Sequence, residues 1–201
     1  MQKIILASQS PRRKQLLEWA EIPFIVITAN TDEAIPEGAA IDEVPIFIAR
    51  EKALVVMHKL GQYEEGRTMP HTELPILAAD TIVVLGNEII GKPTNRAHAI
   101  DILSRLSGKV HRVVTGVVIL HDGKETSFSD STEVVFHGLS LEQIEFYVDT
   151  YKPYDKAGAY AIQEWIGVVG IKSVNGDFYN VMGLPVSRVV KALKSLNVQS
   201  T

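Results

Sequence analysis

Apolar residues in this chain follow two patterns, short continuous runs and stretches in which they recur every three or four positions. The continuous runs predict buried strands, which cover 3–7, 23–27 and 76–85. The three-to-four spacing predicts helices, which cover 44–60, 95–107 and 186–196. The Asp122-Gly123 pair between two further apolar segments, 110–120 and 126–136, predicts a β-hairpin.

Polar residues mark where several of these helices begin. Ser10 before Pro11 is a good N-cap for a first helix, because proline loses nothing at the first helical position. Asp42 and Thr94 are expected to cap the helices over 44–60 and 95–107. Ser140 and Gln143 have the spacing of a capping box, which predicts a further helix to about residue 151.

Strands and helices alternate in the first part of the chain, and a β-meander occupies its middle. This order predicts an α/β fold with a mixed central β-sheet flanked by helices. A length of 201 residues suits one domain or two closely packed lobes, and no linker, internal repeat or low-complexity tract interrupts the sequence. We therefore expect one domain over 1–201.

Composition and charge narrow the class of function. The formal net charge of −4 offers no global basic field for a nucleic acid polymer. No apolar run approaches the roughly 20 residues of a membrane span, and no signal peptide is evident. The chain has no cysteine, which excludes thiolate nucleophiles and cysteine-ligated zinc. We expect a soluble, cytoplasmic protein.

The start of the first predicted helix carries three consecutive cations, Arg12, Arg13 and Lys14. The helix dipole makes positive charge unfavourable there by roughly 0.3–1 kcal/mol per residue. Free N–H groups together with cations at a helix start are a good receptor for phosphate. The alternative is that these side chains simply point into water, and the segment alone does not decide between the two.

Asp80 lies in the middle of the nearly continuous apolar strand over 76–85. A desolvated carboxylate needs cations, hydrogen-bond donors or a metal as partners. Lys52 falls at the edge of the apolar arc of its helix, where a long side chain can reach past the core. Lys92, fixed by Pro93, is a second candidate cation, and Glu33 a second candidate carboxylate. Such a set suits Mg²⁺ or Mn²⁺ with bound phosphates.

Residues 152–163 have no clear period and are dense in polar, aromatic and small residues, which is typical of a binding loop. Lys156 in this loop is a candidate phosphate ligand, although an ion pair with Asp155 is an equally natural role. The six histidines are scattered without metal-ligand spacing, and Walker A, GxGxxG and HExxH motifs are absent from the sequence.

Seven segments in order resemble the Maf family of nucleoside triphosphate pyrophosphatases. They are Leu-Ala-Ser-Gln-Ser-Pro-Arg-Arg at 6–13, Ala-Arg-Glu-Lys-Ala at 49–53, Ala-Asp-Thr-Ile-Val at 79–83, Gly-Lys-Pro at 91–93, Leu-Ser-Gly at 106–108 with His111 and Thr115-Gly116-Val117, Asp-Lys-Ala-Gly-Ala-Tyr at 155–160 with Gln163, and Val-Met-Gly-Leu-Pro at 181–185. The resemblance covers nearly the whole chain. It departs from the family's usual pattern at Ala161 and at Glu164-Trp165.

The resemblance implies a two-lobed fold shared with the inosine-triphosphate pyrophosphatases, with the site in a cleft, and hydrolysis of a nucleoside triphosphate with a divalent cation. Asp80 would accept the proton of the attacking water and lie at the metal, with Glu33 as a second acidic contact. The residues implied to hold the triphosphate are Ser8, Arg13, Lys52 and Lys92. Those implied to set substrate choice are Arg12, Thr81 and Gln163.

Gln163 in its sequence context resembles the branch of the family that acts on dTTP and UTP. The branch acting on 7-methyl-GTP differs in this loop and is the nearest alternative. A second alternative is a nucleotide-binding regulator of cell division or septum formation, although a pure sensor would not need Asp80 as a base. The sequence is also compatible with a homodimer.

Overall fold

The structure is a computed structural model, and it describes residues 2–28, 38–61 and 73–198. The chain divides into two compact units. Unit 1 contains residues 1–80, 115–129 and 183–201, and unit 2 contains residues 81–114 and 130–182. Three long strands pass from one unit into the other, so the boundaries fall inside strands: β3 (Ile76–Leu85), β5 (Val110–His121) and β6 (Lys124–Phe136).

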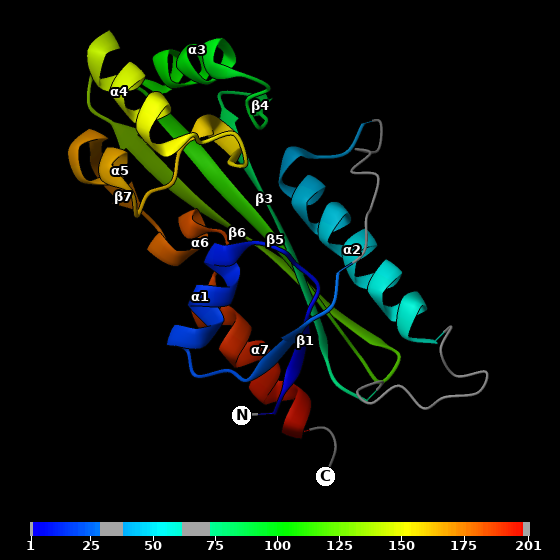
Figure 1. The fold of residues 1–201 in the computed structure, drawn as a ribbon. Coiled ribbons are helices and arrows are strands. Elements are labelled where there is room, and N and C mark those ends of the chain that lie inside the picture. Colours follow the sequence, from blue (N-terminus) through cyan, green and yellow to red (C-terminus); the bar gives the residue numbers. More distant parts are fainter. Residues whose placement is uncertain (1, 29–37, 62–72, 199–201) are drawn as a thin grey trace. The chain divides into compact units, whose positions relative to one another are not determined.

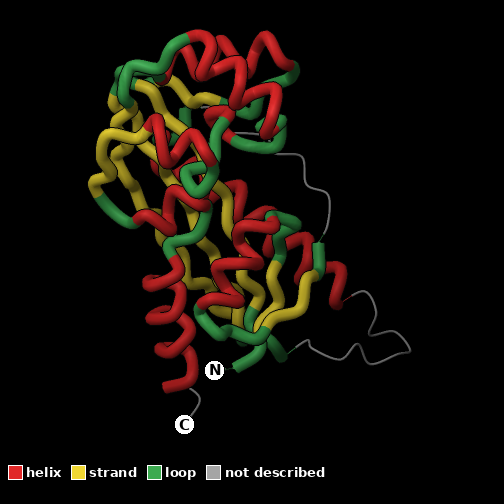
Figure 2. The backbone as a smooth tube through the Cα atoms, turned by 60° about the vertical axis from the view of Figure 1, so that its left-hand side comes forward, coloured by secondary structure: helices red, strands yellow, loops and turns green. Residues whose placement is uncertain are grey.

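The strands among the described residues have the order β2-β1-β3-β5-β6-β7, with β4 paired to β3. Pairing is parallel between β1 and β2 and between β1 and β3, and antiparallel between β3 and β4 and between β6 and β7. Helices (red in Figure 2) accompany the strands (yellow) in each unit. The predicted fold class, a mixed sheet flanked by helices, is therefore confirmed.

Unit 1 begins with two crossover connections. β1 (Ile4–Leu6) leads through α1 (Pro11–Trp19) to β2 (Phe24–Val26), and α2 (Val44–Gly61) leads to β3 on the other side of β1. In Figure 1, α2 lies to one side of β1 and β3, and α1 with α7 (Val186–Val198) lies to the other. The connection that leaves β1 and the connection that enters β3 therefore pass on opposite sides of these strands (Figure 1).

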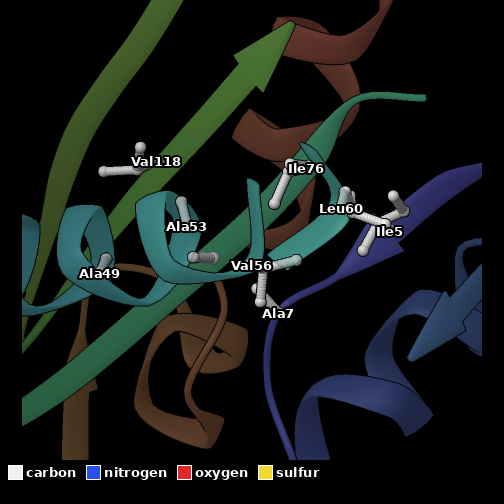
Figure 3. Close-up of a cluster of buried hydrophobic side chains, with 9 residues drawn as sticks. Ile5, Ala7, Ala49, Ala53, Val56, Leu60, Ile76 and Val118 are labelled. Carbon is white, nitrogen blue, oxygen red and sulfur yellow. The ribbon is translucent and has the colours of Figure 1, made fainter. Parts of the chain in front are cut away.

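The core under α2 follows the twofold alternation of strand side chains. Figure 3 shows α2 side chains meeting residues of β1 and β3 in one buried cluster. Its members are Ile5, Ala7, Ala49, Ala53, Val56, Leu60, Ile76, Ala78 and Val118. Because Ile76 and Ala78 face α2, the alternation directs Asp80, two residues further along β3, toward the same helix.

Gly116 on β5 lets the start of α2 approach the strand closely. A Cβ at this position would lie 2.2 Å from the backbone nitrogen of Ile46 and 2.3 Å from the carbonyl carbon of Pro45. Contacts this short do not occur, so only glycine fits without moving α2.

Unit 2 contains the remaining elements. They are β4 (Glu88–Ile90), α3 (Arg96–Leu106), α4 (Leu141–Tyr151), η2 (Ala157–Ala159), α5 (Trp165–Gly170), β7 (Ile171–Asn175) and α6 (Phe178–Met182). Helices α3 and α4 pack against each other. The predicted hairpin is present, and Asp122 and Gly123 at its turn both have positive φ, 49° and 69°.

Two predicted helix caps are confirmed and two are wrong. Ser10 accepts from the Arg13 N–H, and Ser140 with Gln143 forms a complete capping box. The cap of α3 is Asn95 rather than Thr94, because the side-chain Oδ1 of Asn95 accepts from the His98 N–H at 2.9 Å. Asp42 lies inside a 3₁₀ turn, η1 (Ile41–Glu43), that runs directly into α2.

Among the described residues, no helix combines the length and apolar character that crossing a membrane would need.

Candidate active site

The carboxyl end of β1 lies beside the first residues of the long strand β3 in unit 1. Leu6 pairs with Leu77, and the Ala7 N–H donates to the Leu77 carbonyl at 2.8 Å. The connections from β1 and to β3 run over opposite faces, so this is the point of the sheet where helix connections diverge. In open α/β sheets, ligands bind at the carboxyl ends of strands at such a point. Residues 7–13 follow β1 here. Asp80 lies on β3 three residues beyond Leu77, which pairs with the last residue of β1.

Lys52 and Asp80 form a direct ion pair. The Lys52 Nζ donates to the Asp80 Oδ1 at 2.7 Å, and the two side chains are 17% and 14% exposed. The carboxylate points from β3 toward α2, and the lysine reaches it from that helix. This confirms two expectations from the sequence, that Asp80 faces a cation and that Lys52 reaches past the apolar face of its helix.

The first turn of α1 holds its cations in different settings. Arg13 is buried, and its Nη1 donates to the Ser8 Oγ at 3.0 Å while its Nε donates to the Gly183 carbonyl at 2.8 Å. Ser8 Oγ also accepts from the Ser10 N–H at 3.3 Å. Arg13 and Ser8 therefore brace the loop after β1, whereas Arg12 is only half-buried.

In unit 2, Gly158 brings three predicted segments together. Its N–H donates to the Gly91 carbonyl at 3.1 Å, which places the Gly-Lys-Pro segment beside residues 156–159. Gly158 has φ of +70°, and a Cβ there would lie 2.8 Å from the Val83 Cγ2 on β3. Lys92 is exposed beside this contact, and Thr81 begins the unit 2 part of β3.

The loop over 152–163 contains Lys156 and Gln163 in contrasting settings. Lys156 is buried, and its Nζ donates to the Asp155 Oδ1 at 2.7 Å and lies 3.6 Å from the Glu164 Oε1. Gln163 is exposed in a turn. The ion pair between Lys156 and Asp155, an alternative raised by the sequence, is present.

Buried aromatic residues support this loop. Tyr160 packs edge-to-face against His111 and Phe136, with ring centroids 5.4 and 5.0 Å away, and its hydroxyl lies 2.7 Å from the His111 Nε2. Burial lowers the pKa of His111 to about 4 and raises the pKa of Tyr160. His111 is therefore neutral at pH 7 and belongs to the packing of unit 2.

The structure brings the predicted site residues together in part. Unit 1 pairs Lys52 with Asp80 and Ser8 with Arg13. Unit 2 contains Thr81, Lys92, Lys156 and Gln163. Glu33 lies outside the described residues. Sequence reasoning did not find that Tyr147 on α4 contacts the loop, because a buried aromatic residue in an amphipathic helix is typical of a core residue.

The donor set around Asp80 fits a divalent cation that binds together with phosphates. Within the described residues, no group of three histidine, cysteine, aspartate or glutamate side chains could hold a metal by itself. Mg²⁺ is commonly held by one or two carboxylates, with substrate phosphates and waters completing its octahedron. A single carboxylate in the middle of β3, Asp80, matches that arrangement.

Comparison with known sequences places this arrangement in a family. The family described as Maf-like protein matches residues 3–196. The chain belongs to the Maf family, as its seven motifs predicted.

Three proteins that are similar to this chain over nearly its whole length have the same name. Proteins called dTTP/UTP pyrophosphatase from Cytophaga hutchinsonii and Phocaeicola vulgatus are 47% and 46% identical, each over 96% of this chain and over 84% and 96% of their own lengths. A protein of the same name from Halalkalibacterium halodurans is 46% identical over 96% of both chains.

Among solved structures, the Ham1 protein of Staphylococcus aureus aligns over 67% of this chain and 72% of its own, with 14% identity and a TM-score of 0.42. The fold class stated above is taken from the strand order of this chain alone.

Proposed function

We propose that this protein is a dTTP/UTP pyrophosphatase, which hydrolyses these nucleotides to the monophosphate and pyrophosphate. The observation that carries the proposal is the Lys52–Asp80 pair on β3, close to where β1 ends beside Leu77. The names of the relatives, at 42–47% identity, support the same substrates.

Asp80 is the proposed proton acceptor. A water oxygen attacks the α-phosphorus, a new P–O bond forms, and the water proton moves to the Asp80 carboxylate. The bond from the α-phosphorus to the bridging oxygen breaks, and that oxygen leaves with the β- and γ-phosphates as pyrophosphate. General-base catalysis of this kind contributes roughly 10²–10⁴-fold to the rate.

Lys52 has two parts in this proposal. Its hydrogen bond to Oδ1 fixes the direction of the Asp80 carboxylate. Its charge also favours a triphosphate near that carboxylate, because cations stabilise the negative charge that develops on the phosphoryl group and on the leaving group. Lys52 is thus both a positioning residue and a triphosphate ligand.

Other cations and polar groups would bind the substrate. Ser8, Arg13 and Lys92 would hold the triphosphate, as the family resemblance implies. Arg13 is braced by Ser8 and Gly183, so any phosphate contact would come from a guanidinium that is already fixed. Arg12, Thr81 and Gln163 would set the choice of base.

A divalent cation, Mg²⁺ or Mn²⁺, is proposed as the cofactor. Asp80 would hold it, with Glu33 as the second acidic contact. When bound it would neutralise charge on the phosphate oxygens.

The proposal is tested by incubating the protein with Mg²⁺ or Mn²⁺ and a panel of nucleotides that includes dTTP, UTP, dCTP, ATP, GTP and 7-methyl-GTP. We expect monophosphate and pyrophosphate from dTTP and UTP in equal amounts. Preferred turnover of 7-methyl-GTP would assign the chain to the other branch of the family. Tight binding of nucleotides without any product would indicate a sensor, and release of orthophosphate would indicate a different bond cleavage.

A further inference from the structure

A turn of four residues, Ala161 to Glu164, presents Gln163 at the surface of unit 2. Ala161 and Ile162 are buried, Glu164 is half-buried, and Gln163 is exposed. The turn is closed by the Glu164 N–H, which donates to the Ala161 carbonyl at 3.1 Å. The direction in which Gln163 points is therefore set by how the two ends of this turn are held.

One hydroxyl group holds both ends. The Tyr147 hydroxyl accepts a hydrogen bond from the Ala161 N–H at 3.2 Å and donates one to the Glu164 Oε2. Tyr147 comes from α4 and is fully buried, with its ring stacked on that of Tyr151 at a centroid distance of 5.0 Å. The hydroxyl is thus presented from a rigid element, as pre-organised sites require.

Lys156 provides the charge that Glu164 needs. The Glu164 Oε1 lies 3.6 Å from the Lys156 Nζ, and the two side chains are 22% and 10% exposed. A half-buried carboxylate is costly without an opposite charge, and a buried ammonium is costly for the same reason. Since Asp155 also contacts Lys156 at 2.7 Å, two carboxylates surround this one ammonium. Such surroundings leave little net positive charge to attract a phosphate.

We propose that Tyr147 and Glu164 form a clamp on the Ala161–Glu164 turn and thereby act as positioning residues for base selection through Gln163, with Lys156 serving to neutralise Glu164. The proposal rests on the function proposed above, in which Gln163 reads the base. It assigns Lys156 mainly to the clamp rather than to the triphosphate.

Three variants test the clamp. Tyr147→Phe keeps the ring and removes the hydroxyl that bridges the two ends, and Glu164→Ala removes the acceptor. We expect each to reduce the preference for dTTP over dCTP, measured as the ratio of kcat/KM values, by about 10-fold, the loss expected for one hydrogen bond of the stronger kind. The loss should appear in KM for dTTP, with kcat changed little. Glu164→Gln keeps an acceptor for the Tyr147 hydroxyl and should retain most of the preference.

Tyr151→Phe is the matched control, because it removes a hydroxyl from the same helix one turn later. It should leave the preference unchanged. Melting temperatures of all variants separate loss of the clamp from loss of the fold. If Tyr147→Phe does not fold, the comparison of Glu164→Ala with Glu164→Gln decides the matter.

A second readout does not depend on turnover. Hydrogen exchange of the Ala161 amide, followed by NMR, should be slow in the wild-type protein and in Glu164→Gln. It should be at least about 10-fold faster in Tyr147→Phe, because the acceptor of that N–H is gone. Unchanged protection in Tyr147→Phe would overturn the clamp even if the protein has no activity on dTTP.

Gln163→Ala distinguishes failure of the two proposals. If Gln163→Ala loses the base preference while Tyr147→Phe and Glu164→Ala retain it, the clamp is wrong and the proposed function stands. If the wild-type protein does not hydrolyse dTTP or UTP, the proposed function is wrong, and the amide exchange still decides whether the clamp exists.

Discussion

The two units hold their charged groups in different ways. In unit 1, Lys52 and Asp80 stand on regular elements, α2 and β3, and meet directly. In unit 2, Lys156 and Glu164 lie outside the helices and strands, and Glu164 accepts a hydrogen bond from the Tyr147 hydroxyl on α4. A helix or strand fixes the direction of a side chain through its own period, whereas a loop residue depends on hydrogen bonds to distant residues.

In the proposed function, the residues for catalysis and the residues for base recognition therefore lie in different kinds of structure. The group assigned to proton transfer is on a strand, where its position is set by the register of β1 and β3. The groups assigned to base choice are in or next to a loop, where small changes of sequence can redirect a side chain. Variants in unit 1 should therefore change the rate, and variants around residues 161–164 should change the substrate.

The largest expected effect is that of Asp80→Asn. The substitution keeps the shape of the side chain and removes the proton acceptor, so kcat for dTTP should fall by about 10³-fold. Binding of dTTP should remain measurable, because the cations of unit 1 remain. Pyrophosphate release and equilibrium binding measure the two quantities.

Asp101→Asn is the matched control for this variant, since Asp101 is exposed on α3. It should turn over dTTP at the wild-type rate. Wild-type turnover in Asp80→Asn would contradict the assignment of the base and remove the contrast between the units.

The next effect concerns the stability of unit 2 toward acid. The folded pKa of His111, about 4, lies below its ordinary value of 6.5 because the ring is buried. The unfolded chain therefore binds the proton first as the pH falls. Stability should be lost between pH 6.5 and pH 4, by about 2 to 3 kcal/mol at pH 4.5 relative to pH 7.5.

Urea unfolding of the wild-type protein and of His111→Gln at the two pH values isolates this contribution. The variant should lose less stability on acidification, since the glutamine does not titrate. Equal losses in both proteins would show that folding does not lower the pKa of His111.

The smallest effect belongs to the ion pair between Arg50 and Glu125 in unit 1. The Arg50 Nε and Nη2 contact both Glu125 oxygens at 2.7 to 3.1 Å, and these hydrogen bonds hold the pKa of Glu125 below its usual value. The side chains are 35% and 31% exposed, so solvent screens the pair. A double-mutant cycle with Arg50→Met and Glu125→Gln should give a coupling of about 0.5–1 kcal/mol.

Enzyme kinetics test whether Arg50 has a role beyond its ion pair with Glu125. Arg50 stands two residues before Lys52, on the same helix. If the pair only fixes α2 against β6, both single variants should lower kcat/KM for dTTP by a few-fold and to the same extent. A much larger loss in Arg50→Met alone would place the guanidinium at the substrate.

The sequence predicted several of the helices and strands in both units. The period of apolar residues located α2 and β3, and the same period indicated that Lys52 lies at the edge of its helix, where it reaches Asp80. The Asp122-Gly123 turn and the capping box at Ser140 were predictable because each is decided by a few adjacent residues.

Contacts between distant residues could not be predicted in this way. Nothing within the sequence of α4 distinguishes Tyr147, which reaches the turn at 161–164, from an ordinary core residue. The choice between Thr94 and Asn95 as a helix cap depended on a backbone angle, since Asn95 is fully extended with φ of −162°. The prediction that Lys156 binds phosphate did not anticipate that two carboxylates would surround it.

Gly116 connects the packing of unit 1 with its chemistry. The start of α2 rests on the backbone of β5 at this residue, so a methyl group there would displace the helix that carries Lys52. We expect Gly116→Ala to move the Lys52 ammonium away from the Asp80 carboxylate, although residue 116 contacts neither group. If position 116 is randomised and active variants are selected, only glycine should be recovered there, although the residue contributes no functional group of its own.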